Sequence, residues 1–263
     1  MRISLNGQDG TKGSVLVLGM FDGVHLGHRV LLMRAKKLAK TSHVSLVACT
    51  FVSHPMALVR PEKAPPMLTT LEERAKLMEA QGVDILFAQS FDREKMNQPP
   101  EEYIGELCRQ FHPVHIVAGY NFSFGKGGEG TPEMLAAMGG VFGYQAEIVP
   151  PITWGGQGEI SSTVIREYLG QGKVKAAREL LGRAYRREAA VVNRHGKWAE
   201  LVMEPNGKQD VPPGVYRVVL EEGERKFPSL LQVVREGYGR AYLPEDLLPG
   251  KGLNLCFYDS KRG

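Results

Sequence analysis

The sequence predicts an α/β domain with a parallel, Rossmann-like sheet, followed by a small β-barrel-like domain. From residue 14 to about 183, short apolar runs alternate with segments of helical periodicity, which is typical of right-handed βαβ units. From residue 184 onward this alternation ends, and short β-like runs are separated by turn sequences such as Pro205-Asn-Gly207. We therefore expect two domains, at residues 1–183 and 184–263, the second being a barrel or a sandwich.

Five strands are predicted in the first domain, and the first is a short apolar run rich in valine, as expected for a buried parallel strand. They cover residues 14–18, 44–51, 83–87, 114–118 and 145–149. The intervening helices are predicted from periodicity and end signals: Thr70-Leu-Glu-Glu73 is a capping box that begins one helix, and Gly139-Gly140 is expected to end another. The predicted helices cover residues 30–39, 71–80, 99–110, 132–138 and 162–169.

The second domain is predicted from short β-like runs at close spacing. These runs cover residues 189–193, 199–203, 215–220, 230–234 and 253–258. Turn sequences containing glycine and proline lie between them, and this spacing is typical of a small barrel or sandwich.

Composition limits the classes of function. The net charge of +4 suits anionic small molecules, and no concentrated Lys/Arg tract indicates nucleic-acid binding. The three cysteines are isolated, which argues against a disulfide scaffold or a zinc site and favours a reducing, cytoplasmic compartment. No run of 18 apolar residues predicts a membrane segment. A homo-oligomer is compatible with these data.

The most informative segment is Gly19-Met-Phe-Asp-Gly-Val-His-Leu-Gly-His28, because it joins a predicted strand to a predicted helix. Backbone N–H groups at such a junction, together with the helix dipole, bind phosphates. His25 and His28 are three residues apart, so on a first helical turn they would face the same side. The glycine spacing fits neither the G-x-G-x-x-G pattern nor the P-loop. The segment therefore indicates a polyphosphate site of another kind.

Three further constellations follow predicted strands. His54 precedes a proline after the strand 44–51; Asn121 lies in Gly119-Tyr-Asn-Phe-Ser-Phe-Gly125, where it suits a base or a phosphate. The aromatic residues of this segment either flank a bound ring system or pack beneath a glycine-rich turn. In Ile160-Ser-Ser-Thr-Val-Ile-Arg166, Ser161 and Ser162 are good N-caps, and the Arg166 guanidinium suits a phosphate. All of them are expected at one edge of the sheet, where open α/β sheets bind ligands.

Taken together, these four motifs resemble the bacterial FAD synthetases, which are bifunctional riboflavin kinase/FMN adenylyltransferases. The resemblance covers residues 14 to about 185. The H-x-G-H and S-S-T-x-I-R pair is typical of the wider nucleotidylyltransferase superfamily, whereas Phe-Asp-Gly-Val-His-x-Gly-His and Asn-Phe-x-Phe-Gly point to the flavin branch.

The resemblance implies transfer of AMP from ATP to FMN, giving FAD and pyrophosphate. It implies that His25, His28 and Arg166 are catalytic, with the histidines on the ATP phosphates. By the same resemblance the ATP pocket comprises Gly19, Phe21, Asp22, Gly23, Ser161, Ser162 and Thr163. His54 and Asn121 would line it near the substrate phosphates. Magnesium is expected to be held by phosphates and water, so no metal-ligating residues are assigned.

The second domain departs from the family pattern. The riboflavin kinase motif Gly-Phe-Pro-Thr-Ala-Asn is absent, and the segment from Arg187 leads directly to Pro212-Pro-Gly-Val-Tyr-Arg217. We therefore expect a shortened, degenerate kinase barrel without riboflavin kinase activity. Two alternatives stay open: a nucleotidylyltransferase that uses another phosphorylated acceptor, and a non-catalytic flavin- or nucleotide-binding module. For the barrel itself, two roles stay open under any of these functions: a folding support or a dimer surface.

Overall fold

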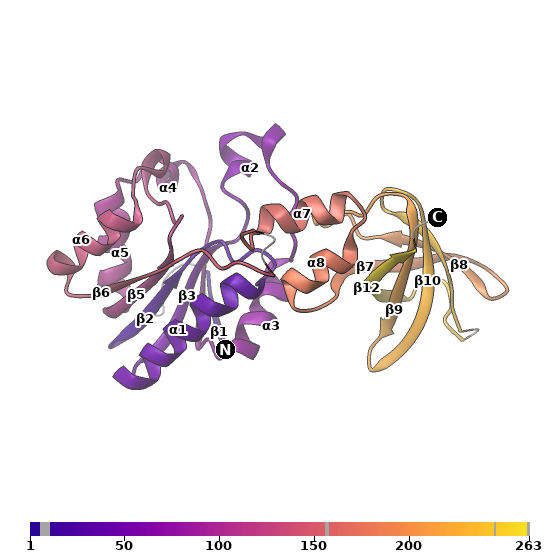
Figure 1. Ribbon diagram of the computed structural model, residues 1–263, viewed down its shortest axis with the longest axis horizontal. Coiled ribbons are helices and arrows are strands. Elements are labelled where there is room, and N and C mark those ends of the chain that lie inside the picture. Colours follow the sequence, from indigo (N-terminus) through magenta and orange to yellow (C-terminus); the bar gives the residue numbers. More distant parts are fainter. Residues whose placement is uncertain (6–10, 156–157, 245, 262–263) are drawn as a thin grey trace. The chain divides into compact units, whose positions relative to one another are not determined.

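The computed structural model describes residues 1–5, 11–155, 158–244 and 246–261 (Figure 1). The chain forms two compact units. The first comprises residues 1–65 and 71–159, and the second comprises residues 66–70 and 160–263. Whether the sequence boundary between the two domains lies near residue 184 stays a prediction. In the described part of the chain, no helix is both long and apolar enough to span a bilayer.

The first unit contains a parallel six-stranded sheet in the order β1-β4-β3-β2-β5-β6. Its strands are β1 (Arg2–Ser4), β2 (Ser14–Leu18), β3 (Ser45–Phe51), β4 (Ile85–Gln89), β5 (Pro113–Gly119) and β6 (Gln145–Val149). Its helices are α1 (Leu26–Ser42), α2 (Met56–Val59), α3 (Leu71–Gln81), α4 (Arg93–Asn97), α5 (Pro100–Phe111) and α6 (Pro132–Phe142). Short 3-10 turns lie at Pro61–Lys63 and Lys126–Gly128.

Helices cover both faces of this sheet, as the apolar strands predict. On one face, Leu16 and Leu18 of β2 pack with residues of α5 and α6, including Ile104 and Leu135. On the other face, alternate residues such as Val15 pack with α1 and α3. Every residue of β2 is buried, because β2 lies inside the sheet and is covered on both sides.

The second unit contains two helices and a closed antiparallel barrel in the order β10-β11-β8-β7-β12-β9. The helices are α7 (Ser162–Gly170) and α8 (Val174–Leu181). The strands are β7 (Tyr185–His195), β8 (Trp198–Met203), β9 (Gly214–Glu222), β10 (Arg225–Arg235), β11 (Tyr238–Tyr242) and β12 (Gly252–Lys261). The expected fold class is confirmed, and closure of the sheet decides for a barrel over a sandwich.

Some predicted elements were wrong in their limits. Gly139 and Gly140 do not end α6, which continues to Phe142 and has Gly143, at φ 80°, as its C-cap. A Cβ on Gly139 would lie 2.5 Å from the Tyr144 carbonyl oxygen, so this glycine permits a close backbone approach instead of ending the helix. The strand predicted at residues 83–87 begins two residues later, at Ile85.

Candidate active site

Three neighbouring strands carry sequence-predicted residues just beyond their carboxyl ends. His54 follows β3, the segment 19–28 follows β2, and Asn121 follows β5. The direction of strand addition reverses between β2 and β5, because β3 and β4 lie on one side of β2 while β5 and β6 lie on the other. Open α/β sheets bind ligands at such a switch point, outside the carboxyl ends of the strands.

The loop after β2 is tightly wound and buried. Phe21, Gly23 and Val24 have φ values of 50°, 81° and 38°, all in the left-handed region. A β-branched residue rarely adopts this conformation, so Val24 is a strained position. Its side chain is buried, and its N–H donates to the Phe21 carbonyl oxygen at 3.0 Å. Strain of this kind persists only where the surrounding structure imposes it, and it is frequent in ligand-binding loops.

His25 and His28 are in contact at the start of α1. His25 is the N-cap residue, and its Nδ1 accepts a hydrogen bond from the His28 backbone N–H at 3.2 Å. Because Nδ1 accepts, the proton of the neutral ring is on Nε2. The two imidazoles stack with ring centroids 3.6 Å apart, and Phe21 meets His28 edge to face at 5.1 Å. The histidines therefore share one side of the first turn, as their spacing predicts.

His54 is held in the same way as His25. Its Nδ1 accepts a hydrogen bond from the Met56 backbone N–H at 3.1 Å. Its Nε2 therefore carries the ring proton as well. Two histidines after neighbouring strands thus have their Nε2–H as a donor, which suits the oxygen atoms of an anionic ligand.

Arg74, which sequence reasoning missed, joins the loops after β2 and β3. Its side chain comes from α3 and is fully buried. Nη1 donates to the Met20 carbonyl oxygen at 3.0 Å and to the Phe51 carbonyl oxygen at 2.8 Å. It also lies 2.9 Å from the Thr50 Oγ1, and Nη2 donates to the Val52 carbonyl oxygen at 3.3 Å. Burial lowers the pKa of Arg74, and the Asp22 and Glu72 carboxylates oppose that shift.

Asn121 is exposed in a turn at the end of β5. A Cβ on Gly119 would lie 3.3 Å from the Asn121 Oδ1, so the amide folds back over the end of its own strand. Phe124 is buried in the sheet core and lies near Tyr103, and Phe122 stacks on it with ring centroids 5.5 Å apart. For Phe124 this position favours the packing interpretation over contact with a bound ring.

The backbone of this loop explains why its motif ends in glycine. Gly125 has φ 71° and ψ −174°, a conformation essentially restricted to glycine. A Cβ there would lie 2.7 Å from the backbone nitrogen of Pro100. Gly127 also has a positive φ of 63°, yet a Cβ there meets nothing within 4 Å.

We therefore expect Gly125→Ala to lower the free energy of unfolding by about 2 kcal/mol more than Gly127→Ala, because only the former adds a backbone clash to the conformational strain. Urea unfolding of the two variants measures this difference directly. Equal losses of stability would contradict the close approach of Gly125 to Pro100.

The second unit carries the other predicted site residues at the start of α7. Ser161 is the N-cap of this helix, and its Oγ accepts a hydrogen bond from the Val164 backbone N–H at 3.3 Å. Ser162 and Thr163 form the first turn, and Arg166 lies one turn further on. The Arg166 Nε donates to the Pro66 carbonyl oxygen at 2.7 Å. A guanidinium held through Nε has four further N–H donors on its terminal nitrogens.

The structure thus brings His28 into contact with both His25 and Phe21, and a Cβ on Gly19 would lie 3.3 Å from the Phe21 ring. Asp22 and Gly23 are buried in the same loop. His54 and Asn121 lie at the ends of the neighbouring strands β3 and β5. Ser161, Ser162, Thr163 and Arg166 form a second group, on the other unit.

A Rossmann-like sheet with a histidine-bearing loop at its switch point defines an α/β protein of the nucleotide-binding type. Comparison with known proteins narrows the class. The family model for FAD synthetase matches residues 8–164. The chain belongs to the FAD synthetase family.

Individual relatives agree with this membership. A bifunctional riboflavin kinase/FMN adenylyltransferase of Listeria monocytogenes is 34% identical over 68% of this chain and 57% of its own length. The match thus spans little more than half of that relative. A FAD synthetase of the same organism is 34% identical over 65% of this chain and 70% of its own length. A crystal structure described as a macrolide-efflux protein from Streptococcus pneumoniae has a TM-score of 0.89, at 26% identity over 99% of this chain and 90% of that one.

Proposed function

We propose that this protein transfers the adenylyl group of ATP to FMN, forming FAD and pyrophosphate. One observation carries the proposal: His25 and His28 are stacked at the start of α1, at the switch point of the sheet. An oxygen of the FMN phosphate attacks the α-phosphorus of ATP while the bond to pyrophosphate breaks. Such a reaction depends on positioning and on stabilisation of charge. Family membership and the likeness to a Listeria FAD synthetase support these substrates.

In this proposal each predicted site residue has a separate role. His25 and His28 hold the ATP phosphates and stabilise charge on the α-phosphoryl group. Gly19, Phe21, Asp22 and Gly23 shape the nucleotide pocket, while His54 and Asn121 line it near the transferring phosphate. Ser161, Ser162, Thr163 and Arg166 hold the β- and γ-phosphates, which leave as pyrophosphate. The Nε2–H donors of His25 and His54 and the terminal N–H groups of Arg166 suit these anionic oxygens.

We propose that Mg²⁺ reaches the site bound to the phosphates of ATP. The described residues contain no group of three or more His, Cys, Asp or Glu side chains placed to hold a metal ion. Asp22 is buried and lies in the field of the Arg74 guanidinium. Magnesium commonly keeps several waters and binds through substrate phosphates, which suits a site of this composition.

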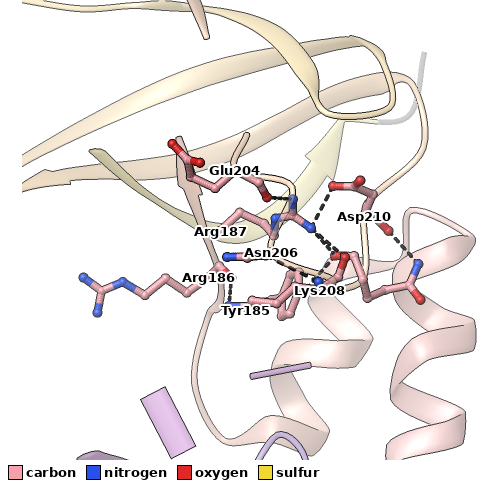
Figure 2. A network of polar contacts seen from close by, with 8 residues as sticks. Tyr185, Arg186, Arg187, Glu204, Asn206, Lys208 and Asp210 are labelled. Carbon is pink, nitrogen blue, oxygen red and sulfur yellow. Dashed lines mark hydrogen bonds and ion pairs between the residues drawn. The ribbon is translucent and has the colours of Figure 1, made fainter. Parts of the chain in front are cut away.

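We further propose that the barrel has no riboflavin kinase activity. The Pro-Thr-Ala-Asn sequence expected from the family is absent. The loop between β8 and β9, residues 204–213, is instead occupied by a polar network in which Arg187 and Lys208 donate to backbone carbonyl oxygens (Figure 2). Their donors are directed at the protein's own backbone, which argues against use of this loop as a phosphate cradle.

A magnesium-ATP assay with FMN or riboflavin in parallel, read by chromatography, tests both parts of the proposal. We expect FAD from FMN and no FMN from riboflavin. FMN formed from riboflavin would contradict the loss of the kinase. No FAD from FMN would contradict the transferase assignment, and a panel of other phosphorylated acceptors then distinguishes a transferase with another acceptor from a binding module.

A further inference from the structure

A short segment from the first half of the sequence is held by the barrel. Residues 66–70 lie between β3 and α3 in the chain but belong to the second compact unit. The Met67 N–H donates to the Gly207 carbonyl oxygen at 2.9 Å, and the Met67 carbonyl oxygen accepts from the Gln209 N–H at 2.7 Å. The 66–70 segment is thus joined, as in a parallel sheet, to the β8–β9 loop.

The 66–70 segment in turn holds a residue of the proposed active site. The Pro66 carbonyl oxygen accepts a hydrogen bond from Arg166 Nε at 2.7 Å, across 100 residues of sequence. A bond to Nε of a planar guanidinium restricts the plane and the direction of its terminal N–H groups. Leu68 and Thr69, which follow in the segment, are buried, so the position of Pro66 is anchored on its carboxyl side.

The β8–β9 loop is itself fixed by two buried cations. Arg187 is 2% exposed; its Nη1 donates to the Lys208 and Gln209 carbonyl oxygens at 2.8 and 3.2 Å, and its Nη2 to the Glu204 carbonyl oxygen at 2.8 Å. Nη1 also pairs with the Asp210 carboxylate at 2.9 Å (Figure 2). Lys208 is 5% exposed and donates to the Arg186 carbonyl oxygen at 2.6 Å.

The contacts with Met67 and the contacts with Arg187 are made by different backbone groups of the same segment, residues 207–209. Gly207 and Gln209 present a carbonyl and an N–H to Met67, while the carbonyls of Lys208 and Gln209 accept from Arg187. Burial of the Arg187–Asp210 ion pair is costly, and burial raises the pKa of Asp210 even beside the Arg187 guanidinium. A loop that only connects two strands does not need these buried contacts of Arg187 and Lys208. A loop that holds the 66–70 segment in place needs one fixed conformation, which such contacts provide.

We propose that the β8–β9 loop sets the orientation of the Arg166 guanidinium, with Arg187 and Lys208 as positioning residues. The connection runs from Arg187 through residues 207–209 to Met67 and Pro66, and from Pro66 to the guanidinium. The barrel thereby contributes to adenylyl transfer without contacting the nucleotide through this loop. The inference rests on the proposed function, in which Arg166 holds the β- and γ-phosphates of ATP.

The test is a double-mutant cycle on the full chain, in which Mg-ATP and AMP affinities are measured by calorimetry. We expect Arg187→Met to weaken Mg-ATP binding about ten-fold, as for a lost charge-assisted hydrogen bond, with AMP affinity unchanged because AMP lacks the two outer phosphates. In an Arg166→Ala background, Arg187→Met should have little further effect on Mg-ATP, since contacts that act through one group are not additive.

Two further variants keep the result interpretable. Lys208→Met keeps the aliphatic part of the side chain and should weaken Mg-ATP binding by a smaller factor than Arg187→Met. It tests the same proposal if Arg187→Met folds poorly. Arg240→Met, which removes an exposed partner of Glu200 on β8, should leave both affinities unchanged.

Two results would overturn the proposed positioning of Arg166 by this loop. One is that Arg187→Met weakens Mg-ATP and AMP binding equally. The other is that Arg187→Met weakens Mg-ATP binding as much in the Arg166→Ala background as in the wild-type chain. Mg-ATP binding that Arg187→Met and Lys208→Met leave unaltered would overturn it as well. A wild-type chain that binds neither nucleotide would contradict the proposed function itself, and this inference with it.

Discussion

Replacing His28 with alanine is expected to lower the kcat of FAD formation by about 100-fold or more, as the loss of one preorganised donor to a developing charge does elsewhere. The His28 ring is held between the stacked His25 and the edge of Phe21. In its proposed role at the α-phosphoryl group, the ring would therefore already be in position when charge develops. Steady-state kinetics with FMN and Mg-ATP measure the change.

The same variant is expected to leave the helix intact. The cap of α1 joins the His28 backbone N–H to the His25 side chain, so removal of the His28 ring does not remove it. His25→Ala, in contrast, deletes the cap and should also cost about 1 kcal/mol of stability. His43→Asn is a matched control, because His43 caps the opposite end of α1 at φ 53°, which asparagine tolerates. An unchanged kcat in His28→Ala would contradict the proposed role of this residue.

Replacing Arg74 with methionine is expected to lower the free energy of unfolding by about 3–5 kcal/mol. Methionine fills much of the volume but removes the guanidinium donor of the Phe51 and Val52 carbonyl oxygens, whereas the Met20 carbonyl oxygen keeps its hydrogen bond from Thr50 Oγ1. An unsatisfied buried acceptor costs its full desolvation penalty. Urea unfolding, followed by circular dichroism, measures the loss.

Lys76→Met is the matched control for Arg74→Met, since Lys76 lies on the same helix but is exposed. It should change stability by less than about 0.5 kcal/mol. An Arg74→Met variant as stable as this control would show that the loops after β2 and β3 do not depend on the guanidinium. Because those loops carry the histidines, we also expect Arg74→Met to weaken Mg-ATP binding in the folded fraction.

Much of the first unit was predictable because its signals are local. Parallel strands buried on both faces are continuous apolar runs, and Ser14–Leu18, in which every residue is buried, was predicted to the residue. Glycines and histidines at a strand-to-helix junction likewise indicated a phosphate site from residue types and spacing alone. The short strands β1 and β11 were missed, since few residues carry their pattern. The helix α8 was also missed, although its buried residues Val174, Ala177, Leu180 and Leu181 lie on one helical face.

The sequence by itself determined the fold class and the family resemblance and predicted the candidate site residues other than Arg74, because each of these depends on patterns within a few residues along the chain. The tertiary structure decided the strand order, the closure of the barrel and the burial of Arg74, Arg187 and Lys208 against backbone carbonyl oxygens. An arginine or lysine in an otherwise ordinary segment has no local signal of burial. Its partners are backbone carbonyl oxygens brought close only by folding, such as that of Met20 for Arg74 and that of Glu204 for Arg187.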